Sequence, residues 1–381
     1  MTLTTGADVL RPEELQNLGK GPREARGLAG RLYTDPAILS VEKEKIFRRE
    51  WMAVFHESTV PNPGDFRVVE LAGDSLLFVR GEDGRLRGFH NICRHRGAQV
   101  AATPQGNCQK FKCPYHTWTY DLHGKLVSAP TMEHMLREGV GLVELRIDTW
   151  MGFVFVNQDG RAEPLASKLA GLDDVLEPWL SKPLEILYEI PYHGKWNWKL
   201  TYENSVEGYH VIGTHYKSAQ WLAPGEMTYT PTEKFDTWTT FYMPYAPGQN
   251  QRDPTGGSVP MDNLPDWIDE EMRFFVMWPN FLISVAPENA TGYIVLPGAT
   301  PGEVTFTWSN IVRPETKAAE NHESYLEEQK YWSQTVQGED QYPCETMWAN
   351  VHSDAFIPGP YADGERAGYH FDQWYLQRMS S

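Results

Sequence analysis

Two short segments carry the residues whose types and spacing suggest chemistry most clearly. The first reads Cys93-Arg94-His95 and the second reads Cys113-Pro114-Tyr115-His116, with 17 residues between His95 and Cys113. Each segment supplies one thiolate and one imidazole. A Rieske [2Fe–2S] centre needs this set, because two cysteines bind one iron and two histidines bind the other. Neutral imidazoles raise the potential of such a centre to roughly −150 to +300 mV, above that of plant-type all-cysteine clusters.

A Cys₂His₂ zinc site would use the same ligand types. Zinc fingers, however, place a cysteine pair before a histidine pair, whereas both segments here are mixed. The spacing therefore favours an iron–sulfur cluster, and a zinc site would instead give a colourless protein.

A second group of candidate ligands lies about a hundred residues further along the chain, where the spacing predicts a helix over 196–212. On a helix, Glu207 and His210 would lie about 60° apart, but His210 and His215 would lie about 140° apart. Two imidazoles could not reach one metal from that geometry. Gly213 falls between the histidines, and because glycine commonly ends helices, a turn there would bring His215 back beside His210.

Two histidines and one carboxylate with open positions form the facial triad of non-haem Fe(II) oxygen chemistry. The candidate carboxylate is Asp340, which we expect just before a helix that runs into Trp348, with Glu339 as the alternative ligand. Two histidines five residues apart are weak evidence alone. Beside a Rieske pattern they indicate a second iron site.

The elements around the first site read as a small β domain over about residues 50–160. Strands are expected at Phe66–Leu71, Leu76–Arg80 and Gly152–Asn157, with a hairpin turn at residues 81–84. We place the two cluster segments on two hairpin tips, where a redox partner can approach them.

The second half of the chain alternates strands with longer helices, which predicts an α+β arrangement. Helices are expected over residues 40–49, 164–179, 196–212 and 314–332, and strands over 184–193, 274–277, 281–286, 293–296 and 304–312. Aromatic side chains on these strands, including Phe274 and Trp308, are candidates for an apolar pocket.

Composition narrows the class of protein. The 381 residues are 41% hydrophobic, which permits two domains, and the formal charge of −17 disfavours nucleic acid or an anionic membrane as a partner. Four cysteines do not suggest an oxidised scaffold, although a Cys108–Cys344 disulfide stays open. Residues 1–6 show no signal-peptide pattern and no apolar run approaches about 20 residues, so we expect a soluble cytoplasmic protein.

Together these motifs resemble the α subunit of Rieske non-haem iron oxygenases, from about residue 40 to the end. Two metal signatures occur in that family's order, the second as Asn197-Trp198-Lys199 followed by Glu203-Asn204-x₂-Glu207-x-Tyr209-His210-x₄-His215. The resemblance implies a small all-β Rieske [2Fe–2S] domain plus a helix-grip catalytic domain with an antiparallel sheet and long helices.

The resemblance also assigns residues by position. The cluster ligands would be Cys93, His95, Cys113 and His116. The ligands of a mononuclear Fe(II) would be His210, His215 and Asp340. Two catalytic positions would accompany them: Asn204 as a neighbour of the iron site and Glu207 as the acidic bridge between the two metal centres.

One departure bears on the reaction. Many ring-dihydroxylating members have Asp at the bridge, whereas this chain has Glu207. A Glu there resembles branches that oxidise or dealkylate other substrates, including quaternary amines, yet those amine enzymes often have Cys where this chain has Gly208. Glu203, on the same segment, is interpreted as structural.

We therefore expect a terminal oxygenase that uses O₂ and electrons from NAD(P)H. The chain has no Gly-x-Gly-x-x-Gly fingerprint, so a separate ferredoxin or flavin reductase must handle NAD(P)H and flavin. Monooxygenation of an aromatic or amine compound, by hydroxylation or N- or O-dealkylation, is favoured over aromatic cis-dihydroxylation. The alternative of another class is a Rieske electron-transfer protein, which would need no second iron site.

The expected division of the chain follows the two sites. Residues 1–48 would form an N-terminal helical segment on the catalytic domain, 49–160 the Rieske domain and 161–381 the catalytic domain. The resemblance implies a homotrimer in which one subunit's cluster feeds its neighbour's iron, with a small β subunit left open.

Overall fold

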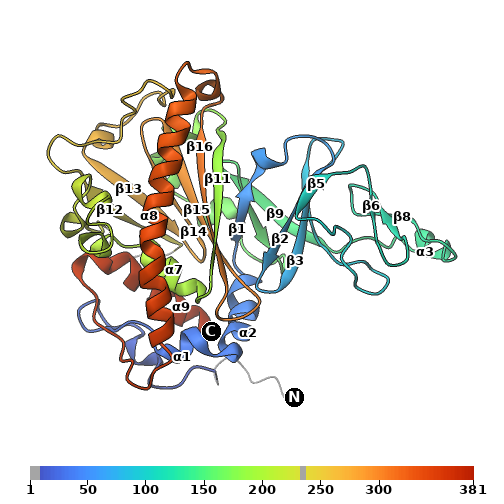
Figure 1. The fold of residues 1–381 in the computed structure, drawn as a ribbon. Coiled ribbons are helices and arrows are strands. Elements are labelled where there is room, and N and C mark those ends of the chain that lie inside the picture. The colour runs from blue at the N-terminus through green and yellow to red at the C-terminus, as the bar shows by residue number, and fades with distance from the viewer. Residues whose placement is uncertain (1–8, 232–236) are drawn as a thin grey trace. The chain divides into compact units, whose positions relative to one another are not determined.

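The computed structural model describes residues 9–231 and 237–381 (Figure 1). The backbone divides into two compact units, one of residues 47–162 and one of residues up to 46 together with 163–381. The predicted fold class is confirmed, because both units contain antiparallel sheets and the larger unit adds helices. Within the described ranges, no helix is both long and apolar enough to cross a membrane. Residues 1–6, where the sequence predicts no signal peptide, lie outside those ranges.

The smaller unit is built on a seven-stranded antiparallel sheet in the order β1-β10-β9-β4-β3-β2-β5. Every residue of β1 and β10 is buried, as expected for short apolar runs in a core. The bounds are β1 Met52–His56, β2 Asp65–Leu71, β3 Asp74–Arg80, β4 Leu86–His90, β5 Gln105–Asn107, β9 Glu144–Trp150 and β10 Phe153–Asn157. Strands β2, β3 and β10 confirm the three predicted strands of this region.

A second, three-stranded sheet of the same unit holds one of the two cluster segments. It comprises β6 Phe111–Lys112, β7 Thr119–Tyr120 and β8 Leu126–Ser128, followed by the short helix α3 His134–Arg137. Cys113–His116 lies at the tip of the β6–β7 hairpin, as predicted. Cys93–His95 instead lies in the loop from β4 to β5, and these strands pair with other strands, so the predicted hairpin tip is wrong there.

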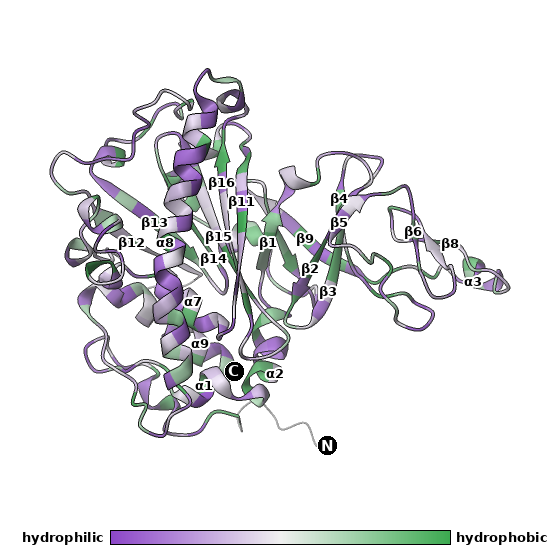
Figure 2. Cartoon of the chain, in the orientation of Figure 1, coloured by the Kyte–Doolittle hydropathy of each residue, from purple (hydrophilic) through white to green (hydrophobic). Residues whose placement is uncertain are grey.

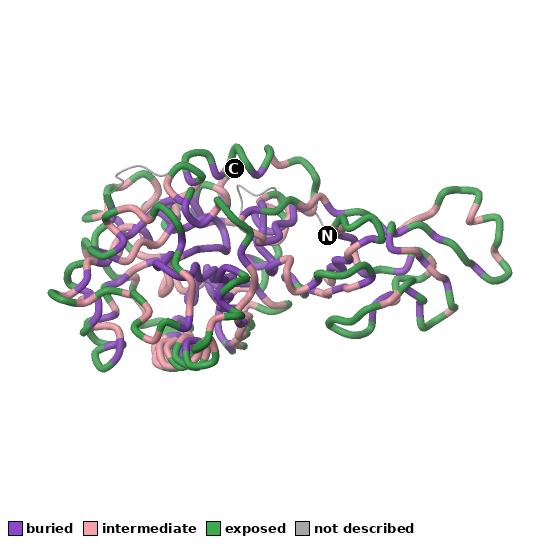
Figure 3. The backbone as a smooth tube through the Cα atoms, turned by 90° about the horizontal axis from the view of Figure 1, so that it is seen from above, coloured by how far each residue is buried: buried purple, intermediate pink, exposed green. Residues whose placement is uncertain are grey.

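The larger unit is organised around a six-stranded antiparallel sheet in the order β11-β16-β15-β14-β13-β12. The bounds are β11 Glu185–Gly194, β12 Trp238–Pro244, β13 Glu271–Met277, β14 Phe281–Val285, β15 Asn289–Pro297 and β16 Val304–Val312. All nine residues of β15 are buried. The strands carry long stretches of apolar colour in Figure 2, and the buried backbone gathers in the middle of this unit in Figure 3.

Helices cover this sheet. The 29-residue α8 runs along one face of it (Figure 1) and packs on β11, while α7 packs on β15 and β16. The bounds are α1 Gly30–Thr34, α2 Pro36–Glu42, α4 Leu165–Lys168, α5 Leu172–Val175, α6 Glu177–Leu180, α7 Trp198–Ser205, α8 His322–Asn350 and α9 Arg366–Ser380. The sheet and helices together hold the second candidate site.

Three predicted helices differ from the observed ones. The helix expected over 40–49 starts earlier, at Pro36, and continues after Glu42 as a π-helical turn. The 164–179 helix is three short helices, because Gly171 adopts a left-handed conformation with φ 86° between the first two. The 314–332 helix is a 3₁₀ turn at its start, and α8 begins only at His322.

Candidate metal centres

The two cluster segments fold into matching loops. In each loop the cysteine N–H donates to the carbonyl five residues later: Cys93 to Ala98 at 2.8 Å and Cys113 to Trp118 at 2.8 Å. The cysteine carbonyl in turn accepts from the N–H four residues later, that of Gly97 at 2.9 Å and that of Thr117 at 3.1 Å. Gly97 and Thr117 occupy equivalent positions with φ of 78° and 60°. Two equal loops thus present one cysteine and one histidine each.

The four side chains of these loops fit an iron–sulfur cluster. Cys93 and Cys113 are each 2% exposed, and the rings of His95 and His116 lie 4.5 Å apart between centroids. The Nδ1 atoms of both histidines are buried and have no hydrogen-bond partner among the described residues. A buried polar atom without a partner costs about 1–3 kcal/mol. Two such nitrogens beside two buried thiols are the donors that a Rieske centre takes.

Aromatic side chains enclose this donor set. Trp118 is 2% exposed and stacks on the His95 ring, with 5.0 Å between the ring centroids. The Tyr120 hydroxyl lies 3.3 Å from the Cys93 sulfur and accepts the Arg94 N–H at 3.0 Å. Burial raises the pKa of the Cys93 thiol. The loops therefore keep the sulfur atoms dry while their outer histidine edges stay nearer the surface.

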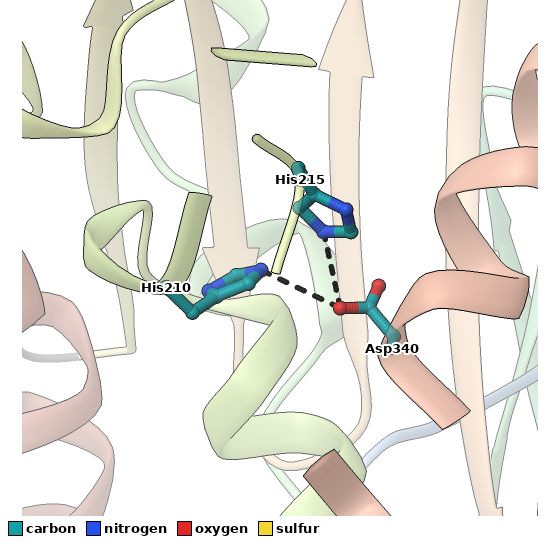
Figure 4. Close-up of side chains that lie close together, drawn as sticks. All are labelled: His210, His215 and Asp340. Atoms are coloured by element: carbon teal, nitrogen blue, oxygen red, sulfur yellow. Dashed lines mark ion pairs between the residues drawn. The ribbon is translucent and has the colours of Figure 1, made fainter. Parts of the chain in front are cut away.

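The second group of ligands converges within the larger unit. One nitrogen each of His210 and His215 and one oxygen of Asp340 all lie within 4.8 Å of one another. The Asp340 Oδ1 atom is 3.6 Å from Nε2 of His210 and 3.1 Å from Nε2 of His215, and Figure 4 shows both rings turned toward it. Two imidazoles and a carboxylate in this arrangement suit Fe(II).

Polar partners orient these three side chains. Glu207 Oε1 lies 2.5 Å from His210 Nδ1, and Glu207 Oε2 accepts the backbone N–H groups of Tyr209 and His210. Asn204 donates from Nδ2 to Asp340 Oδ1 at 3.3 Å. The two positions assigned as catalytic by resemblance therefore contact the ligand set directly.

The local route to His210 differs from the prediction. Helix α7 ends at Ser205, so Glu207 and His210 do not share a helix face; they meet across the turn before the 3₁₀ segment Tyr209–Ile212. The turn has no room for a side chain at Gly208, since a Cβ there would lie 2.3 Å from Thr228 Oγ1. Gly213, the predicted breaker, caps this 3₁₀ segment, and the rings of His210 and His215 lie 5.0 Å apart, as predicted. A Cβ at Gly213 would meet only the His210 carbonyl oxygen, at 4.0 Å.

The position of Asp340 also differs from the prediction. It lies inside α8, eighteen residues after the first helical residue, and not before a helix. Its neighbour Glu339 places Oε2 2.8 Å from His215 Nδ1, the ring nitrogen that does not face Asp340. Sequence reasoning considered Glu339 only as a substitute ligand, so its contact with His215 was missed. The two cysteines left open for a disulfide, Cys108 and Cys344, are both free.

Charge around His210 favours its protonated form when no cation is bound. Burial lowers the pKa of His210, but the Glu207 and Asp340 carboxylates outweigh burial and raise it to about 9. A divalent cation bound here would offset the charge of the two carboxylates in place of protonated His210, and its binding would release the His210 proton.

A small apolar chamber adjoins these ligands. Its volume is about 100 Å³, and no described lysine or arginine lines it. Six aromatic side chains form part of its wall: Phe241, Phe274, Tyr293, Phe306, Trp308 and Trp332. The predicted pocket role of Phe274 and Trp308 agrees with this lining. A second chamber of about 400 Å³ is more polar and shares Met272, Tyr293, Trp308 and Trp332 with the first. The two chambers therefore share part of their walls, with the more apolar one beside the ligands.

Two family models match the chain. The ring hydroxylating alpha subunit (catalytic domain) model matches residues 183–381. The Rieske [2Fe-2S] domain model matches residues 50–146. The first match covers the converging His210, His215 and Asp340, and the second covers both cluster loops.

Relatives with assigned activities match most of the chain. The glycine betaine monooxygenase oxygenase subunit of Pseudomonas aeruginosa is 25% identical, over 91% of this chain and 87% of that protein. The carnitine monooxygenase oxygenase subunit of Escherichia coli is 27% identical, over 84% and 83%. The structure of a quaternary ammonium Rieske monooxygenase, described for carnitine oxidation and inter-subunit electron transfer, superposes with a TM-score of 0.77 at 22% identity, over 94% and 96%.

Proposed function

Because the chain belongs to the ring hydroxylating alpha subunit family and is a Rieske non-haem iron oxygenase, we propose that it monooxygenates an amine with N-alkyl groups. The observation that carries this proposal is the chamber beside His210, His215 and Asp340, which has aromatic walls. Aromatic faces attract alkylammonium groups. Two relatives that act on such amines match most of the chain.

The cofactors of this oxygenase are a Rieske [2Fe–2S] cluster and a mononuclear iron. We propose Cys93, His95, Cys113 and His116 as the cluster ligands and His210, His215 and Asp340 as the iron ligands. Their support is the pair of unpartnered Nδ1 atoms and the convergence of three donors. Held by these residues, a Rieske cluster and a mononuclear iron would supply the one-electron transfers and the oxygen chemistry of the reaction.

The protein's own side chains have defined tasks in this proposal. Glu207 holds the His210 ring through Nδ1, and Asn204 holds the Asp340 carboxylate. The aromatic wall excludes water and places an N-alkyl C–H bond toward the metal ligands. Glu207 would also connect to the cluster of a neighbouring subunit.

The overall reaction balances as an N-dealkylation. The substrate R–N(CH₃)₃⁺ with O₂, two electrons and two protons gives R–N(CH₃)₂, formaldehyde, water and one proton. One oxygen atom leaves in formaldehyde and the other in water. The two electrons come from NAD(P)H through a ferredoxin or flavin reductase.

The assembly belongs to the proposal as well. We propose residues 49–160 as the Rieske domain, 161–381 as the catalytic domain and 1–48 as a segment packing on the latter, in line with the two compact units. A cytoplasmic homotrimer would allow one subunit's cluster to serve its neighbour's iron.

The second candidate reaction is cis-dihydroxylation of an aromatic ring, which the same aromatic wall could hold by stacking. The two relatives named for glycine betaine and carnitine, which match most of the chain, favour an amine over a neutral ring. A bare electron carrier is excluded by the catalytic-domain match over residues 183–381.

A single-turnover experiment tests the proposal without a known redox partner. Protein loaded with about three irons and two sulfides per chain is reduced, desalted anaerobically and mixed with O₂ and a panel of N-methylated amines or aromatic hydrocarbons. We expect formaldehyde with the amines. A cis-diol from the hydrocarbons, with no formaldehyde, would establish the second candidate instead.

The variant Asp340→Ala separates the two metal sites in the same experiment. It should yield no product and bind about two irons per chain, while the reduced protein keeps its Rieske electron paramagnetic resonance signal. Glu345→Gln, an exposed substitution on the same helix, is the control and should behave as wild type. Turnover by Asp340→Ala would show that Asp340 is not an iron ligand.

A further inference from the structure

The His215 ring is held at both nitrogens by consecutive residues of α8. Asp340 Oδ1 lies 3.1 Å from Nε2, and Glu339 Oε2 lies 2.8 Å from Nδ1. Successive residues of a helix point about 100° apart, so neighbouring carboxylates can reach opposite edges of one imidazole. The ring, which is 3% exposed, has little freedom to turn.

Glu339 is itself fixed by a second contact. The Ser218 hydroxyl donates to the same Oε2 atom of Glu339, and the Ser218 N–H donates to the His215 carbonyl at 3.1 Å. Ser218 is 6% exposed. These three side chains therefore form a closed arrangement that joins α8 to the segment after the 3₁₀ turn.

We propose that Glu339 is a positioning residue for the mononuclear iron, an inference that rests on the proposed iron site. By accepting the Nδ1–H of His215, it selects the tautomer whose Nε2 lone pair faces Asp340. The charged acceptor also makes the imidazole a stronger electron donor. Glu207 does the same for His210, so both histidines are paired with a carboxylate.

Two other roles for Glu339 predict different behaviour. If it were an iron ligand, its oxygen would face the Nε2 atoms, whereas it contacts Nδ1 of His215. If it were only a surface carboxylate, its removal would leave the metal unaffected. Its side chain is 27% exposed, and the contacts with His215 and Ser218 define the side of the ring that it occupies.

The test compares Glu339→Ala and Glu339→Gln with the wild type after anaerobic reconstitution. The readouts are the Fe(II) dissociation constant, the rate at which ferrozine removes the mononuclear iron, and the electron paramagnetic resonance spectrum of the nitric oxide adduct. We expect Glu339→Ala to weaken Fe(II) binding by about 10–100-fold. Glu339→Gln keeps an acceptor oxygen without its charge and should lie between Glu339→Ala and the wild type.

Glu345→Gln is the matched control, because Glu345 is exposed on the same helix and its Oε1 accepts from Gln341 Nε2 at 2.7 Å. Ser218→Ala removes the donor that fixes Glu339 and should weaken Fe(II) binding less than Glu339→Ala does. The Rieske signal serves as the folding check for every variant.

The outcomes separate this inference from the proposed function. Wild-type affinity and spectrum in Glu339→Ala, with an intact Rieske signal, would overturn the positioning role. If the wild type and Asp340→Ala instead bind the same amount of iron, the proposed iron site itself fails. Weaker binding in Glu339→Ala with a normal control supports both.

Discussion

Glu207 serves two structures with one carboxylate. One oxygen contacts His210 Nδ1 at 2.5 Å, and the other accepts two backbone N–H groups of the following turn. The same side chain therefore shapes the turn that carries His210 and orients the ring. A second carboxylate, Glu339, orients His215 from a different element. The geometry of the site depends on side-chain length as much as on charge.

Shortening the Glu207 side chain tests whether its reach to His210 and to the backbone matters. Glu207→Asp keeps the charge but removes one methylene, so it cannot reach the ring and both N–H groups together. We expect the single-turnover rate, followed by Rieske reoxidation and product, to fall by about 10–100-fold. The control is Glu226→Asp, at an exposed carboxylate that accepts from Gln220 at 2.7 Å. A wild-type rate in Glu207→Asp would mean that the contact with His210 is dispensable.

At the scale of elements, the turn after α7 decides where His210 lies. The backbone at Gly208 passes so close to Thr228 that a side chain has no space, since a Cβ would lie 2.3 Å from Oγ1 and 3.2 Å from Met243 Cε. Gly208→Ala must displace these neighbours. Overpacking of this kind costs about 1–3 kcal/mol, so we expect a lower melting temperature and weaker retention of the mononuclear iron.

Gly213→Ala provides the matched comparison for Gly208→Ala. Its backbone φ of −106° suits any residue, and a Cβ there would meet only one atom, at 4.0 Å. We expect unchanged or slightly higher stability, because alanine restricts the unfolded chain more than glycine does. Equal destabilisation by both substitutions would contradict a steric role specific to Gly208.

These two glycines show what the sequence could and could not predict. Spacing indicated the two cysteine–histidine segments and the pair His210 and His215, and the resemblance pointed to Asp340. The apolar pattern predicted β16 with its observed bounds, Val304–Val312. The tight turn at Gly208 could not be predicted, because Thr228 comes close to Gly208 only in the folded chain.

The position of Asp340 in the middle of α8 could not be predicted either. Gly338 and Pro343 flank it and normally weaken or end helices, yet both lie within α8. Packing of α8 on β11 offsets these local preferences. The contact between Glu339 and His215 spans 124 positions of sequence, so no local pattern could indicate it.

Titration of a buried carboxylate links stability of the larger unit to pH. Burial raises the pKa of Glu288 from 4.5 to about 7, and its Oε2 has no hydrogen-bond partner among the described residues. The folded chain holds the Glu288 proton more tightly than the unfolded chain does. Protonated Glu288 therefore contributes its full stabilisation below pH 4.5, and this contribution is lost as the pH rises to about 7.

Glu288→Gln removes this titration while keeping a neutral side chain of the same shape. The variant should match the wild type near pH 4.5 and become more stable than it by pH 7.5. The difference is at most about 3 kcal/mol, reduced by any water that reaches the carboxylate. Melting temperatures across this range provide the measurement, and a difference independent of pH would contradict the raised pKa.

At the scale of the whole molecule, the proposed trimer predicts that two inactive chains can repair each other. Asp340→Ala keeps a cluster but no mononuclear iron, and Cys113→Ser keeps the iron site but no cluster. If electrons pass between subunits, an Asp340→Ala chain can serve the iron of a Cys113→Ser neighbour. Transfer within one subunit allows no such rescue, because every chain lacks one centre.

Co-expression of the two variants with different affinity tags isolates mixed assemblies for single-turnover measurement. In a closed ring of three subunits that contains both variants, about one third of the interfaces join an intact cluster to an intact iron site, whichever variant is present twice. We therefore expect product at about one third of the wild-type yield per chain. Each variant alone serves as the control and should give none. Mixed assemblies that co-purify, retain the Rieske signal and form no product would show that each subunit supplies its own iron.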